Sequence, residues 1–315
     1  MLKEQLEFQI FELKRILKSF DIDVSLIEQH QISKSTVNYV LDKKYLMKIS
    51  THVMEVVMKL ERVNELSLAP KVLIANSFEH LENIYYFIVY DYLVGDDLDS
   101  VIPYLSTEQS IQIGKDLVEF IAKLNTFNDP FYDIGHYIPT IPRYEYSWQQ
   151  GHLKYVQCLS DNLETINMSV KNKEVVSLAL TYIYQHIDCL KYQEGPKLLH
   201  NDLHPKNIIV DNNKLVGVID WECSQFGELD FELSHLFHWC IYPSIPDKRF
   251  ELLLKTVFKG FMSIYQTTDI GQRLTIYQLE HELNQIIWNN TSIDERITRI
   301  KGWKDGQLID LISKW

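Results

Sequence analysis

The chain of 315 residues is long enough for two domains, or for one large domain with a deep cleft. Its 46% hydrophobic and 23% charged residues are ordinary for a globular protein, and no apolar run predicts a transmembrane helix. The first twenty residues are charged and periodic, unlike a signal peptide, so we expect a cytoplasmic protein. A net charge of −12 argues against nucleic acid as a partner. It suits a cationic small molecule, or simply solubility.

The N-terminal third predicts a small mixed lobe. Apolar side chains recur every three or four residues over 2–20 and again over 52–66, which predicts two amphipathic helices. Short β-rich runs predict five strands, at 24–30, 36–41, 45–50, 71–78 and 84–93. Helix, three strands, helix and two strands indicate a lobe built on an antiparallel sheet.

Beyond Gly95 the sequence is mostly helical. We expect helices near 107–126, 147–164, 172–192, 229–241, 247–266 and 272–289. Two short strands, "NIIVD" and "LVGVID", interrupt them and flank the turn "NNK". The predicted fold is therefore α+β and bilobal, with lobes at 1–94 and 95–315 and a ligand cleft between them. Four widely spaced cysteines without a C-x-x-C pair predict neither a zinc site nor disulfides.

Polar side chains crowd between two apolar runs in "LLHNDLHPKNIIV". His200, Asp202 and Asn207 follow the spacing H-x-D-x-x-x-x-N, and Asp220 ends the next apolar strand. Phosphoryl transfer needs a carboxylate that orients or deprotonates the attacking hydroxyl, and hard oxygens that hold magnesium against the nucleotide phosphates. Asp202 would be the base, and Asn207 and Asp220 the metal ligands. A lone aspartate in a turn is usually a local cap, but the joint pattern favours a nucleotide-phosphate site.

The segment "HNDLHPKNIIVDNNKLVGVIDWE" resembles the signature of the aminoglycoside phosphotransferase and choline kinase family. These are small-molecule kinases with a protein-kinase-like fold, whereas protein kinases show HRD and DFG in place of "HNDLHPKN" and "IDWE". The resemblance implies that Asp202 is the catalytic base, that Asn207 and Asp220 bind Mg²⁺, and that His200 braces the loop. It also implies ATP or GTP as the phosphoryl donor.

The resemblance requires a lysine in the N-terminal lobe that contacts the nucleotide phosphates. Lys48, at the end of "YLMK", fits, and Glu55 is its expected partner on the next helix, with Glu61 as the alternative. Any single Lys or Glu is more often a solvated charge. The segment "SKSTVN" at 33–38 occupies the place of the phosphate-covering hairpin, and is otherwise an ordinary polar turn.

The segment "IVYDYLVGDDL" resembles the hinge of this family. The backbone at Asp91 and Leu93 would hydrogen-bond the purine, and Tyr90 would stand at the back of the pocket. In some members a bulky residue there favours guanine, so ATP is the first expectation and GTP the alternative.

The segment "FGELDFELSHLFHW" is similar to a further stretch of the family. Gly227, Glu232 and Leu233 match in kind, whereas Glu228 and Leu229 replace the usual Asp and Pro. We expect Glu228 to stabilise the N-terminal end of a helix through the dipole rather than to contact the substrate.

The acceptor is the least determined part of the prediction. Acidic and aromatic residues of the C-terminal lobe could contact a cation, or be ordinary surface and core: Asp161, Glu164, His238 and Trp288. We expect transfer of the γ-phosphoryl group to a hydroxyl of a small polar, cationic acceptor, first of all an aminoglycoside. Choline, another amino alcohol or a sugar-like metabolite is the alternative. A nucleotide-binding pseudokinase scaffold is a third, disfavoured by the complete set of catalytic residues.

Overall fold

The computed structural model describes residues 8–32, 36–51, 63, 66, 68–133, 144–145, 147–191, 194–265, 267, 269–288 and 292–315. The chain divides into two compact units, one of residues 1–100 with 206–222 and one of 101–205 with 223–315. The functional division predicted at residues 94 and 95 stays a prediction. That prediction assigned residues 206–222 to the C-terminal lobe, whereas in the structure they pack with the first unit.

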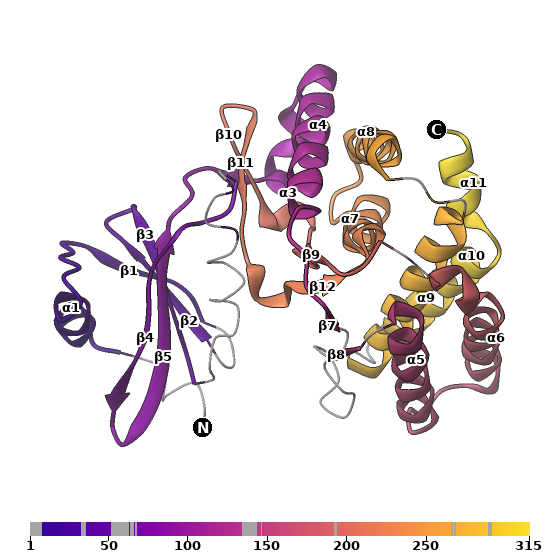
Figure 1. The fold of residues 1–315 in the computed structure, drawn as a ribbon, viewed down its shortest axis with the longest axis horizontal. Coiled ribbons are helices and arrows are strands. Elements are labelled where there is room, and N and C mark those ends of the chain that lie inside the picture. The colour runs from indigo at the N-terminus through magenta and orange to yellow at the C-terminus, as the bar shows by residue number, and fades with distance from the viewer. Residues whose placement is uncertain are drawn as a thin grey trace. The chain divides into compact units, whose positions relative to one another are not determined.

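The first unit is built on a five-stranded antiparallel sheet, as predicted (Figure 1). Its spatial order is β1-β2-β3-β5-β4, with β1 (Ile27–Ile32), β2 (Thr36–Leu41), β3 (Tyr45–Ser50), β4 (Val72–His80) and β5 (Asn83–Asp91). β-Branched and aromatic residues, which favour strands, dominate β2 and β5. Register places Lys48 of β3 opposite Ile88 of β5, in the middle of the sheet.

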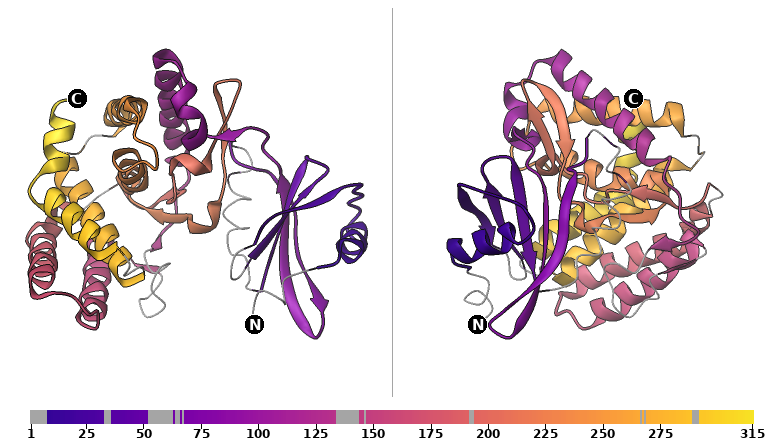
Figure 2. Two further views of the ribbon diagram at one scale, coloured as in Figure 1. Left: turned by 180° about the vertical axis from the view of Figure 1, so that it is seen from behind. Right: turned by 60° about the vertical axis from the view of Figure 1, so that its left-hand side comes forward.

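Helix α1 (Ile10–Lys18) packs against this sheet (Figures 1 and 2). Leu13 and Leu17 are fully buried in a core with Phe87 and other side chains of the sheet. Ile10, which was expected on the same apolar stripe, is 53% exposed because it begins the helix at the edge of the contact. The helix predicted over 52–66 falls almost wholly outside the described residues.

A second sheet explains why residues 206–222 belong to the first unit. It has the order β11-β10-β6, with β6 (Asp96–Asp97), β10 (Ile208–Asp211) and β11 (Lys214–Val218). Val218 donates its N–H to Leu68 O at 2.8 Å, which fixes the end of β11. At Gly217 an added Cβ would lie 2.8 Å from the same carbonyl oxygen, so a glycine permits this approach.

The second unit is mostly helical. Its helices are α4 (Thr107–Leu124), α5 (Trp148–Glu164), α6 (Val170–His186), α7 (Glu232–Ile241), α8 (Lys248–Ile264), α9 (Ile270–Trp288), α10 (Ile293–Lys304) and α11 (Gln307–Ser313), and α3 (Leu98–Val101) joins the units. The six predicted helices are confirmed, but α6 ends at His186, where 192 was expected, and a 3₁₀ turn follows it (Ile187–Leu190). Helices α10 and α11 were not predicted. Among the described residues, no helix has both the length and the apolar character needed to cross a membrane.

Short strands frame the polar loop of the second unit. β9 (Lys197–Leu199) pairs antiparallel with β12 (Gln225–Gly227), and β7 (Tyr132–Asp133) pairs with β8 (Tyr144–Glu145). Because β9 ends at Leu199, the loop that starts at His200 emerges from a fixed point in the core.

Candidate active site

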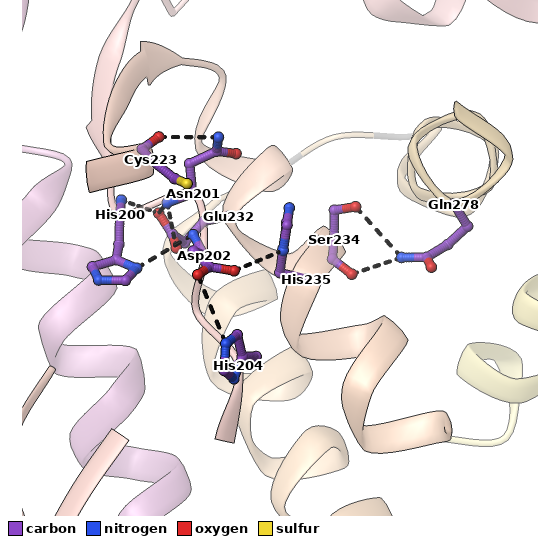
Figure 3. Close-up of polar contacts among 9 residues, drawn as sticks. All are labelled: His200, Asn201, Asp202, His204, Cys223, Glu232, Ser234, His235 and Gln278. Carbon is purple, nitrogen blue, oxygen red and sulfur yellow. Dashed lines mark hydrogen bonds and ion pairs between the residues drawn. The ribbon is translucent and has the colours of Figure 1, made fainter. Parts of the chain in front are cut away.

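Glu232 holds the backbone of the loop that carries Asp202 (Figure 3). It is the first residue of α7 and is fully buried. Its carboxyl oxygens accept the N–H of His200 at 2.6 Å and that of Asn201 at 3.3 Å. Burial raises the pKa of Glu232 to about 8, against the lowering effect of these two donors. The helix and the loop are therefore joined by one buried carboxyl group.

Two further contacts shape the loop. Asn201 has a left-handed φ of 59°, and its side-chain amide donates to Cys223 O at 3.1 Å. His200 is fully buried, and its Nδ1 accepts the N–H of Asp202 at 3.3 Å. This position suits the bracing role expected of His200, which stays a prediction.

Asp202 lies between two histidines (Figure 3). Its Oδ1 is 3.3 Å from His235 Nδ1, and its Oδ2 is 3.7 Å from His204 Nε2. Burial alone would raise the pKa of Asp202, but contact with His235 and the charges of His235, His204 and His200 hold it below the ordinary value. Asp202 is thus ionised near neutral pH, as a base or an orienting group must be.

Lys48 meets two carboxylates of the first unit. Its Nζ is 2.5 Å from Glu222 Oε1 and 3.4 Å from Asp220 Oδ1, and the lysine is buried. Glu55 and Glu61, the expected partners, lie outside the described residues, so that pairing is untested. Glu222 was not predicted, although its place two residues after Asp220 in "IDWE" was a usable signal.

Asn207 and Asp220 are tied together through the backbone. Asn207 ends a 3₁₀ turn (Pro205–Asn207), and its carbonyl accepts the N–H of Ile219 at 2.9 Å. Asp220 has a left-handed φ of 64° and an exposed carboxylate. Both line one cavity of about 460 Å³ in the first unit, together with Lys48 and Tyr90. A volume of this size is typical of small-ligand sites.

The donor set in this cavity fits magnesium. An amide oxygen and a carboxylate are hard ligands, and Mg²⁺ commonly binds one or two carboxylates together with substrate phosphates and water. Across the described residues, no group of three or more His, Cys, Asp and Glu side chains suits a metal by itself. Asn207 and Asp220 would therefore hold an ion whose coordination nucleotide phosphates complete.

The predicted hinge residues line the same cavity. Tyr90, Asp91 and Leu93 all border it. Asp91 donates its N–H to Lys71 O at 3.0 Å, so that donor is engaged within the first unit. Burial, with Asp220 and Glu222 nearby, raises the pKa of the Tyr90 hydroxyl. The purine contacts themselves stay predictions.

Residues suggested for the substrate have ordinary surroundings. Asp161 is exposed and accepts the Gln157 amide one turn away, and Glu164 is exposed at the end of α5. Trp288 is 73% exposed. His238 is buried, with Nδ1 3.4 Å from Glu282 Oε1. These surroundings match ordinary surface and core positions.

Glu228 lies at the N-terminal end of the turn that leads into α7, as expected, but its surroundings disfavour the expected role. It is fully buried before the 3₁₀ turn Leu229–Phe231 and accepts the hydroxyl of Tyr132. Burial raises the pKa of Glu228 to about 9, so the side chain is protonated at neutral pH. An uncharged carboxyl group has no charge to offer a helix dipole.

The comparisons with known proteins agree with this geometry. The model of the phosphotransferase enzyme family (APH) matches residues 53–251. The chain belongs to this family. Among curated proteins, this phosphotransferase is similar to hygromycin-B 4-O-kinase of Escherichia coli, with 36% identity over 42 residues. That match covers 13% of this chain and only 12% of the relative.

Solved structures extend the likeness to nearly the whole chain. A thermostable mutant of aminoglycoside phosphotransferase APH(4)-Ia, bound to AMP-PNP and hygromycin B, has 16% identity and a TM-score of 0.64, covering 96% of this chain and 98% of that one. The GDP complex of aminoglycoside 2'-phosphotransferase-IIIa has 13% identity and a TM-score of 0.66, covering 96% and 99%. The streptomycin–ATP complex of APH(2")-IIa has 16% identity and a TM-score of 0.63, covering 94% and 96%. At these identities the likeness shows the fold, and the predicted kinase-like α+β fold is confirmed.

Proposed function

We propose that this phosphotransferase is a small-molecule kinase that moves the γ-phosphoryl group of ATP or GTP to a hydroxyl of an aminoglycoside. The observation that carries the proposal is the ionised Asp202 on a loop braced by Glu232, in a chain of the phosphotransferase family. The nucleotide residues of the first unit supply the other half of the chemistry.

The first unit would bind the nucleotide. The purine would lie against the hinge backbone at Asp91 and Leu93, and Lys48 would contact the phosphates. Asn207 and Asp220 would hold Mg²⁺, which neutralises phosphate charge when it is bound. The shared cavity of Lys48, Asn207, Asp220 and the hinge residues supports these roles.

Asp202 would act on the acceptor. Its carboxylate would accept the hydrogen bond of the attacking hydroxyl, orient the oxygen toward the γ-phosphorus, and take the proton as the new P–O bond forms. The bond from the γ-phosphorus to the bridging oxygen of the nucleotide breaks at the same time, and ADP or GDP leaves. Its lowered pKa keeps it ready for this at neutral pH.

An aminoglycoside is favoured as acceptor for two reasons. The chain carries a net charge of −12, which suits a polycation, and its structural relatives include complexes with hygromycin B and streptomycin. Transfer to such an antibiotic would modify it covalently, so antibiotic resistance and a cytoplasmic site of action belong to the same proposal. Relatives with AMP-PNP, ATP and GDP support both nucleotides as candidates.

A panel assay tests the proposal. Purified protein with Mg²⁺ and either ATP or GTP is incubated with hygromycin B, streptomycin, choline and neutral sugars, and the acceptors are weighed by mass spectrometry. We expect one added phosphoryl group on an aminoglycoside. Phosphorylation of choline or a sugar, but of no aminoglycoside, would show that the proposed acceptor class is wrong. Magnesium-dependent nucleotide binding without any phosphorylated acceptor would instead indicate a pseudokinase.

A further inference from the structure

A small cavity of the second unit shares a wall residue with the surroundings of Asp202. The cavity has a volume of about 100 Å³ and is lined by aromatic rings, including Trp148, Phe231 and Tyr277. His235 of α7 also lines it, and the same ring lies 3.3 Å from Asp202 Oδ1. One side chain therefore connects the cavity to the proposed base.

Helix α7 holds the Asp202 loop at two points. Glu232 binds the loop backbone, and His235 meets the carboxylate from the same face one turn later. His235 Nδ1 faces Asp202 Oδ1 at 3.3 Å, close enough for the ring to favour the ionised carboxylate. A rigid helix thus fixes both the path of the loop and the position of its carboxylate.

The other groups that face His235 leave Asp202 as its main charged neighbour. His281 of α9 packs edge-on against the His235 ring at 5.6 Å, and burial holds the pKa of His281 well below its ordinary value. Burial also lowers the pKa of His238 to about 3. Glu280, across the cavity, is 2.8 Å from His152 Nδ1. On the loop side, His204 lies 3.7 Å from the second oxygen of Asp202, and His200 accepts the N–H of Asp202.

We propose that His235 is a positioning residue, which holds the Asp202 carboxylate in the orientation that receives the acceptor hydroxyl. The effect on turnover rests on the proposed kinase function, whereas the contact itself does not. Loss of His235 lets the carboxylate turn and removes a group that favours its ionised form. The His235 ring also lines the cavity. A group of the acceptor that binds in the cavity would therefore contact the same residue that positions Asp202.

Two substitutions separate positioning from simple packing. His235→Asn keeps a donor near the place of Nδ1, and His235→Leu removes it. We expect kcat to fall roughly 10-fold in the first and roughly 100-fold in the second, as for a misplaced catalytic group, with the nucleotide KM unchanged. The acid limb of the kcat/KM profile should move to higher pH in both. His186→Asn, which replaces a histidine that contacts Tyr182 O, is the matched control and should behave as the wild type.

A titration without acceptor keeps this inference separate from the proposed function. With [4-¹³C]aspartate labelling, the Asp202 carboxyl resonance is assigned through its absence in Asp202→Asn and followed against pH. We expect the measured pKa of Asp202 to rise in both His235 variants and to stay unchanged in His186→Asn. An Asp202 titration indifferent to His235→Leu would overturn the inference, even if acceptors are phosphorylated. If the Asp202 pKa shifts in the His235 variants but the protein phosphorylates no acceptor, the His235–Asp202 contact is supported and the proposed kinase function is not.

Discussion

Lys48 shows most clearly how single residues set the proposed nucleotide site. It is buried on β3 with two carboxylate neighbours, Asp220 and Glu222. Lys48→Met removes a cation from the proposed nucleotide cavity, so nucleotide affinity should fall roughly 10- to 100-fold, which corresponds to the loss of one charge-assisted hydrogen bond. Calorimetric titration with Mg²⁺–nucleotide measures it. Lys44→Met, at an exposed lysine of the same unit, should bind as the wild type. Equal nucleotide affinity of Lys48→Met and Lys44→Met would show that Lys48 does not contact the nucleotide.

The motif residues could be identified from the sequence because they follow a characteristic local spacing. Asp202, Asn207 and Asp220 stand within one short segment, and the structure places Asn207 at the end of a 3₁₀ turn and Asp220 two residues after β11, whereas their roles stay predictions. Glu222 and His235 were missed for different reasons. Glu222 could have been predicted from its place in "IDWE", two residues after Asp220. His235 could not, because it is brought to Asp202 by the packing of α7, which no spacing in the sequence reveals.

The contact between α7 and the Asp202 loop should contribute to the stability of the fold. Glu232→Ala leaves the N–H groups of His200 and Asn201 buried without their acceptor. Each such donor costs about 1–3 kcal/mol, so denaturant unfolding should show a clear loss of stability. Glu164→Ala, at an exposed glutamate ending α5, should lie within about 0.5 kcal/mol of the wild type. Similar stabilities for the two variants would argue against the brace.

A buried ion pair joins α9 to the turn before α7. Arg273 binds Asp230 through two nitrogens, at 2.5 and 2.9 Å, and both side chains are buried. Arg273→Leu strands a buried carboxylate and should cost about 3–5 kcal/mol in urea unfolding. Arg249→Leu breaks the partly exposed pair with Asp247 and should cost about 1 kcal/mol or less. A cost for Arg273→Leu no larger than that for Arg249→Leu would contradict this interpretation.

Element prediction succeeded where periodicity was long and failed where elements were short. Six helices of the second unit follow from apolar stripes, but α10 buries a short stripe of three side chains, Ile297, Ile300 and Trp303, and α11 has seven residues. Strands β6, β9 and β12 have two or three residues each, too few for an alternating pattern. Their pairing comes from tertiary contacts.

For the whole molecule, buried glutamates predict how stability depends on pH. The pKa of Glu232 is raised to about 8 and that of Glu228 to about 9, so the folded chain keeps protons that the unfolded chain releases above about pH 4.5. Because the folded state then binds more protons, unfolding free energy should fall as pH rises from about 5 to 9. Thermal unfolding should show Tm declining by several degrees across this window. Glu228→Gln should weaken that slope, and an equally steep slope in the variant would count against a protonated Glu228.

The order of the lobes could be predicted from the sequence, but the composition of the first unit could not. Residues 206–222 join it because β10 pairs with β6, about a hundred residues earlier in the chain, and because Gly217 allows β11 to approach Leu68. Local propensity does not encode such pairing. Over 94–96% of the chain the fold agrees with aminoglycoside phosphotransferases at 16% sequence identity, since a shared core tolerates extensive substitution.

The most direct test of the account is phosphoryl transfer by Asp202→Asn beside the wild type, with nucleotide affinity measured on both. We expect the wild type to phosphorylate an aminoglycoside and the variant to lose kcat by roughly 10²- to 10⁴-fold, because the base is gone while the nucleotide residues remain. Nucleotide affinity should be the same in both proteins. Undiminished phosphoryl transfer by Asp202→Asn would contradict the central claim.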